Sequence, residues 1–263
     1  MDASFLQTYL LSQFLIFTLV LTRVSGLVMT APIFGTPDVP VRVRALLAVA
    51  LALLITPMYS GTTVDDPGTL PNYLVYIGGE ALVGLLLGLG IMILFTGVQV
   101  AGQIISQLSG MALADVFSPG FDANVPMFSQ LLYFVAMAVF VLIDGHRLVM
   151  AALLDTFYQI PPGAGGLSGS VVETLTTILT QSFSLGIRAG APIMTALLLS
   201  TLVLGLISRT MPQLNIIAIG FGMNSLVTLG GLFLGMGAIV WVFQEQVEPM
   251  LELLGGSLNY GAG

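Results

Sequence analysis

Few residues in this chain of 263 could carry out chemistry. It has one histidine, His146, no cysteine, and only arginines among its six basic residues. These counts exclude thiolate catalysis, sulfur-ligated metals, P-loop or Schiff-base lysines and multi-histidine metal sites. The densest polar cluster is Asp144–Arg147, where His146 beside a carboxylate could relay protons near neutral pH. Because adjacent residues do not share a helix face, we favour a polar helix end and expect neither an enzyme nor a cofactor.

Arg188 is an isolated charge between long apolar runs. A charge at such a place costs about 2.5–3.5 kcal/mol on membrane-insertion scales, so it should face protein or water and have a partner. We expect Glu80 or Glu173 to be that partner. A buried structural ion pair is favoured over a transport-coupling charge, because no carboxylate stands at helical spacing from this lone arginine.

An irregular segment, Ser106–Asp122, ends one of the long apolar runs. Gly110 and Pro119 prevent it from remaining helical throughout. Non-helical backbone at membrane depth is tolerated only against protein or a water-filled cavity, so a mobile loop here could close a pore. A re-entrant loop and a plain surface turn are the alternatives. The side chains available for such a seal are Met111, Phe117 and Phe121.

A second polar segment, Arg209–Asn215, separates the last two apolar runs. Pro212 forces a turn or a fresh helix start there. The side chains of Arg209, Gln213 and Asn215 can all donate hydrogen bonds. The segment is therefore either a solvated turn or a docking site.

The composition is typical of a membrane protein. Thirteen acidic and six basic residues make up 7% of the chain, against about 25% in an ordinary soluble domain. Much of the surface must therefore face lipid or other protein rather than water. With a net charge of −7 the chain has no basic patch to track phosphates, so we expect no nucleic-acid partner.

Charge-free runs locate about six hydrophobic helices, each with roughly the 20 residues needed to cross a bilayer core. The runs are Ala3–Thr22, Ala45–Val64, Ala81–Ala114, Ala123–Ile143, Ala189–Ser208 and Thr210–Gln244. A helix over Leu74–Gly110 would measure ~55 Å against a core of ~30 Å. Thr174–Ser208 has a similar excess and contains Pro192. We predict an all-α membrane protein of long, partly broken helices.

Glycines at i, i+4 spacing leave grooves where another helix backbone can approach closely. The pairs are Gly84 with Gly88, Gly186 with Gly190, and Gly231 with Gly235. Packing within the chain and packing against other subunits are equally open.

Most of the arginines lie near the loops after the first and fifth apolar runs. These are Arg23, Arg42, Arg44 and Arg209. Since cytoplasmic loops carry an excess of basic residues, both loops are expected to face the cytoplasm.

Several stretches resemble the family of the flagellar biosynthetic protein FliR, which also includes the injectisome export protein SctT. The stretches include Thr22–Leu27, Ala31–Gly35, Val39–Arg44, Gln99–Gln103, Leu204–Arg209 and Met211–Asn215. The resemblance runs in order from about Phe5 to Phe243, and its most specific part is the Arg-x-x-Pro-Gln-x-Asn pattern that begins at Arg209.

The resemblance implies a core subunit of the flagellar type III protein export gate, in the basal body at the bacterial inner membrane. Such a subunit would join several copies of FliP and FliQ in a helical assembly that conducts unfolded flagellar proteins. It would consist of a FliP-like portion over residues 1–170, fused to a FliQ-like helical hairpin over residues 171–263. FlhB and FlhA would engage the gate at its cytoplasmic mouth.

The resemblance also implies roles for individual residues. The family's pore-closing loop corresponds to Ser106–Asp122, and the hairpin tip to Arg209–Asn215. The plug role would fall to Ser106, Gly110, Met111, Phe117, Pro119 and Phe121. The docking role at the cytoplasmic tip would fall to Arg209, Pro212, Gln213 and Asn215.

A second function also remains open at this point. A stand-alone small-solute transporter is favoured by Arg188, Glu80 and the broken helices, which are typical of binding sites at the membrane midplane. A membrane-embedded enzyme ranks last, since it would need a nucleophile with a base, or a metal cluster.

Overall fold

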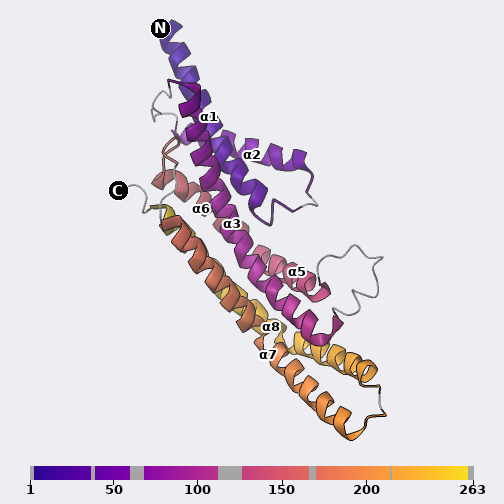
Figure 1. The fold of residues 1–263 in the computed structure, drawn as a ribbon. Helices are drawn as coiled ribbons and strands as arrows, with labels where there is room; N and C mark the ends of the chain where they lie inside the picture. The colour runs from indigo at the N-terminus through magenta and orange to yellow at the C-terminus, as the bar shows by residue number, and fades with distance from the viewer. Residues whose placement is uncertain are drawn as a thin grey trace. The chain divides into compact units, whose positions relative to one another are not determined.

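The computed structural model describes residues 3–36, 39–59, 68–111, 126–165, 170–213 and 215–259, and every element that these residues form is a helix (Figure 1). The elements are α1 (Ala3–Thr30), α2 (Val41–Ile55), the short 3₁₀ helix η1 (Thr56–Tyr59), α3 (Leu70–Ser109), α5 (Met127–Leu142), α6 (Gly145–Gln159), α7 (Ser170–Thr210) and α8 (Ile216–Asn259). The predicted all-α class is confirmed.

The number of possible membrane spans also agrees with the prediction. Among the described residues, five helical stretches are long and apolar enough to cross a membrane. The α5–α6 pair gives a sixth if it is counted as one span bent by 69°. The three longest helices far exceed a bilayer core of ~30 Å, since α3 has 40 residues, α7 has 41 and α8 has 44, which is about 60–66 Å each. None of the three is interrupted: α7 continues through Pro192 and α8 through Pro249.

The break in the helical structure lies between α5 and α6. Asp144 adopts φ 58°, a left-handed conformation that Asp tolerates better than most residues. Its N–H still donates to the Val141 carbonyl at 3.1 Å. At the next position, a Cβ on Gly145 would lie 2.6 Å from the Phe140 ring. The polar cluster of the sequence is therefore a helix boundary, which agrees with the interpretation favoured above.

The chain forms two compact units, each of which is described by itself. The first consists of Met1–Ile93, His146–Ile178 and Pro249–Gly263, and the second of Leu94–Gly145 and Leu179–Glu248. In the first unit α1 and α3 run side by side (Figure 1), at a distance that only glycines permit. A Cβ on Gly84 would collide with the Arg23 carbonyl oxygen, and one on Gly26 would lie 3.0 Å from the Ala81 carbonyl oxygen.

The second unit packs helices on a row of glycines and one aromatic cluster. A Cβ on Gly97 would meet the backbone of Ser182, so the second part of α3 lies directly against α7. The Phe95 ring contacts the rings of Tyr133, Phe140 and Phe243, with centroids 5.4–5.7 Å apart. These aromatic contacts join α3, α5 and α8.

The three glycine pairs predicted from the sequence all face helices of the same chain. Gly84 and Gly88 lie against α1, and Gly186 lies against the backbone of Gly97 in α3. Gly190 faces α3 as well, and Gly231 and Gly235 face Ile193 of α7. Packing within the chain thus explains these grooves.

Candidate functional site

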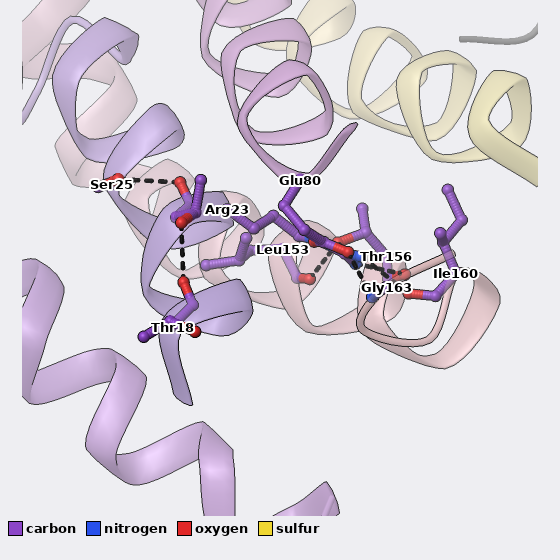
Figure 2. A network of polar contacts seen from close by, with 9 residues as sticks. Thr18, Arg23, Ser25, Glu80, Leu153, Thr156, Ile160 and Gly163 are labelled. Carbon is purple, nitrogen blue, oxygen red and sulfur yellow. Dashed lines mark hydrogen bonds and ion pairs between the residues drawn. The ribbon is translucent and has the colours of Figure 1, made fainter. Parts of the chain in front are cut away.

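A buried ion pair joins α1 to α3 in the first unit. Arg23 and Glu80 have no exposed side-chain surface, and Arg23 Nε donates to Glu80 Oε2 at 2.6 Å (Figure 2). Such a pair is tolerated only when the remaining donors and acceptors of both groups are also satisfied, because each charge has lost its hydration.

The end of α6 supplies those remaining partners. Arg23 Nη1 donates to the Thr156 carbonyl at 3.0 Å and Nη2 donates to the Ile160 carbonyl at 3.0 Å (Figure 2). These carbonyls lie at a helix C-terminus, where some have no partner within the helix. The other oxygen of Glu80 accepts the Gly163 N–H at 2.8 Å. The pair therefore fixes α1, α3 and the end of α6 to one another.

An aromatic ring covers the same guanidinium. The carbon at the centre of the Arg23 guanidinium lies 4.2 Å from the centroid of the Phe157 ring, a distance at which a cation is attracted to the ring face. Phe157 in turn contacts Tyr59 of η1, with ring centroids 5.9 Å apart. The α6 face thus supplies both hydrogen-bond acceptors and a π surface.

Sequence reasoning missed Arg23. It had placed this residue near a loop, because the charge-free run stops at Thr22, whereas α1 continues to Thr30. One signal was available: Arg23 and Gly26 are three residues apart and so share a helix face. The face that approaches α3 most closely therefore also carries the charge.

The expected partners of Arg188 were wrong. Arg188 pairs with Glu245 of α8, with Nη2 and Oε2 3.8 Å apart and the side chains 50% and 48% exposed. Glu80 is occupied by Arg23, and Glu173 is exposed in the first turn of α7. Of the three residues proposed as buried charges, only Glu80 is buried in this chain. A pair as exposed as Arg188–Glu245 contributes little stability.

The proposed plug segment begins where α3 ends. Gly110 has φ 80°, a left-handed conformation that suits glycine after a helix. Its N–H donates to the Gln107 carbonyl at 3.2 Å. Ser106 is buried and Met111 is half-buried. The remaining plug candidates lie outside the described residues. They are Phe117, Pro119 and Phe121.

The hairpin tip lies between α7 and α8. Its four candidate residues are exposed, which the structure shows for Arg209, Pro212, Gln213 and Asn215. Asn215 Oδ1 accepts the Ala218 N–H at 3.3 Å and so caps the first turn of α8. Asn215 therefore has a structural role as a helix cap, which is separate from the docking role expected from the sequence. The other three side chains are exposed in the last turn of α7 and in the turn that follows it.

One face of α8, which we call the glycine groove, is apolar and has nothing packed on its glycines in the described chain. Gly222, Gly230 and Gly237 each face empty space, since an added Cβ would meet nothing within 4 Å. Phe233 lies on the same face and is 85% exposed. Glycines beside a protruding ring are typical of a surface that receives another helix.

The described part of the chain shows no group of three or more His, Cys, Asp or Glu residues that could hold a metal ion. Its functional features are thus the buried Arg23–Glu80 ion pair, the helix ends at Gly110 and at Asn215, and the glycine groove of α8. Each of these positions protein segments.

Comparison with known proteins gives a consistent result. Residues 14–250 match a family described as bacterial export proteins, family 1. The chain is 32% identical to the flagellar biosynthetic protein FliR of Escherichia coli K12 over 201 residues, which cover 76% of each chain. It is 30% identical to that of Bacillus subtilis 168 over 254 residues, covering 90% of this chain and 94% of the relative. For Caulobacter vibrioides the identity is 26%, over 89% of this chain and 94% of the relative.

Proposed function

The chain belongs to family 1 of the bacterial export proteins and is a membrane component of a flagellar export apparatus, and from this we propose that it is a non-enzymatic core subunit of the export gate. In this role it helps to form the channel through which unfolded flagellar proteins cross the bacterial inner membrane. The stand-alone small-solute transporter considered from the sequence finds no support in these relatives.

The open groove on α8 is the observation that supports this proposal most. The chain packs its own helices through glycines, as Gly26 and Gly84 do between α1 and α3. Gly222, Gly230 and Gly237 offer the same kind of surface with nothing packed on it in the described chain. Helices of FliP and FliQ are the partners that we propose for this groove.

The hairpin supports the proposed division of the chain. Helix α7 begins at Ser170 and is followed directly by α8. Within the second unit the two helices are joined by Ser200 Oγ, which donates to Asn224 Oδ1 at 2.8 Å. Residues 171–263 then form the FliQ-like portion and residues 1–170 the FliP-like portion of a single chain.

We place the seal of the channel at Ser106–Asp122 and the docking surface at the hairpin tip. Gly110, with its left-handed φ, ends α3 within this segment. In the closed gate Met111, Phe117 and Phe121 fill the passage, because flexible and aromatic side chains can close around an irregular gap. At the tip Arg209 and Gln213 present donors to FlhB and FlhA.

Co-purification of the full-length chain with FliP and FliQ tests the proposal. We expect Gly230→Leu to fill the groove and to reduce recovery of the partners at least tenfold. Gly256→Leu is the matched control, because Gly256 also faces open space but lies on a different side of α8. Equal recovery with both variants would show that the groove is not the interface. A solitary wild-type chain that transports a metabolite in proteoliposomes would refute the export-gate role.

A further inference from the structure

Helix α2 is the least covered of the long apolar helices. Of the five candidate spans, the stretch Val41–Tyr59 has the smallest share of buried residues. Within α2 only Ala48, Ala52 and Ile55 are buried. They lie at spacings of four and three and so form the one line by which α2 packs on the first unit. In Figure 1 the rest of α2 projects away from α1.

The exposed side of α2 lacks the features through which this chain packs helices. Close contacts elsewhere involve glycine, as at Gly84 and Gly97. The only pair of small residues at i, i+4 spacing on α2 is Ala48 with Ala52, and it is already buried. The exposed side carries valine, leucine and alanine, without glycine, serine or threonine. Bulky aliphatic residues without a groove suit acyl chains better than another helix.

A single arginine lies at one end of this apolar side. Arg42, Leu46, Val49 and Leu53 follow one another at spacings of four, three and four, and all four are exposed. Helix α2 has no acidic residue, and no described carboxylate bonds to Arg42. Arg42 thus has no carboxylate partner among the described residues and stands in line with an apolar stripe, which is the arrangement of a side chain at the level of lipid headgroups.

The neighbouring arginine is engaged in a different way. Arg44 Nη2 donates to the Val39 carbonyl at 2.9 Å, and Nε donates to the same oxygen at 3.0 Å. Arg44 thus stabilises the turn before α2, whereas Arg42 is exposed and has no carboxylate partner among the described residues. A guanidinium matches a phosphate group in shape and charge.

We propose that the exposed side of α2 faces membrane lipid, with Arg42 bound to the phosphate of an anionic phospholipid and Leu46, Val49 and Leu53 against its acyl chains. This assignment requires a membrane protein but does not require the proposed channel role. It distinguishes two outer surfaces of the chain: α2 meets lipid, whereas the glycine groove of α8 meets protein.

Site-directed spin labelling tests the lipid contact, since the chain has no native cysteine. Leu46→Cys, Leu53→Cys and the buried control Ala48→Cys each carry one nitroxide. The full-length chain, purified with its co-purifying subunits, is placed in bilayers of phosphatidylethanolamine and phosphatidylglycerol. We expect the labels at positions 46 and 53 to collide often with dissolved oxygen and rarely with a water-soluble nickel chelate. The label at position 48 should be shielded from both.

Two results would overturn the lipid contact. Shielding from both reagents at positions 46 and 53 would mean that another protein covers α2. Free access of the nickel chelate would mean that α2 faces water.

The headgroup is tested by titrating the delipidated complex with phosphatidylglycerol and measuring bound lipid by native mass spectrometry. Arg42→Gln should weaken the tightest phosphatidylglycerol site about fivefold, the factor expected for one cation near an anionic surface. Arg42→Lys should recover most of the affinity, and Arg188→Gln should leave it unchanged. Equal binding by wild type and Arg42→Gln would overturn the role of Arg42.

Discussion

Arg23 and Glu80 are 57 positions apart in the sequence and meet at 2.6 Å with neither side chain exposed. Their contact joins α1 to α3 beside a close approach of the two backbones, since Gly84, one turn after Glu80, lies against the Arg23 carbonyl. The same guanidinium binds the end of α6. One side chain thus determines how three helices of the first unit are placed.

Removing one member of this pair should destabilise the protein strongly. Arg23→Ala or Glu80→Ala leaves an uncompensated buried charge, which costs about 3–5 kcal/mol. We expect a marked fall in Tm for the detergent-solubilised complex, measured by intrinsic fluorescence. Arg188→Ala is the matched control and should change stability by less than about 1 kcal/mol, because its pair with Glu245 is half exposed. Equal losses in the two arginine variants would contradict the special role of the buried pair.

The glycine contact between α1 and α3 makes a separate prediction. In Gly84→Ala the new Cβ collides with the Arg23 carbonyl oxygen, so α1 must shift. We expect a loss of about 1–3 kcal/mol, the usual cost of overpacking, measured as a lower Tm. Gly78→Ala, on the same helix but facing open space, should be neutral or slightly stabilising. An unchanged Tm in Gly84→Ala would show that the helices are not held this close.

Cap and docking functions at the hairpin tip can be separated by their effects. Asn215→Ala removes the acceptor for the Ala218 N–H and should cost about 1 kcal/mol, whereas Asn215→Asp should retain the cap. Arg209→Ala and Gln213→Ala should reduce flagellar protein export without lowering Tm. Secretion assays and thermal unfolding of the same preparations distinguish these outcomes, and normal export by both variants would count against docking.

The seal can be tested by deletion. Removing residues 110–121 takes away the segment that we propose fills the passage, while α3 can still end at Ser109. We expect a raised ion leak when the chain is expressed together with its partner subunits, measured as membrane conductance. The control is a deletion variant expressed without partners, which should not leak. Unchanged conductance in the complete complex would remove the plug proposal.

The general character of the molecule could be predicted from its residues alone. A charge content of 7% and runs of about 20 apolar residues indicate segments that lie in lipid. In lipid such a segment must be helical, because a helix pairs all of its backbone hydrogen-bonding groups within itself. The absence of cysteine and lysine excluded most catalytic sites directly. The resemblance carried by residues such as Arg209 and Pro212 indicated the family, which the comparisons confirmed.

The tertiary structure alone decided which charges and which grooves meet. Arg188 looked isolated and Arg23 looked peripheral, yet Arg23 is buried and Arg188 is half exposed. The reason is physical: periodicity shows which face a residue occupies, but the partner of that face depends on how distant helices pack. The same holds for glycine, because α1 occupies the space beside Gly84, whereas the space beside Gly230 is empty in the described chain. Spacing located the three glycine pairs that the chain fills itself, whereas only packing could reveal the uncovered glycines Gly222, Gly230 and Gly237.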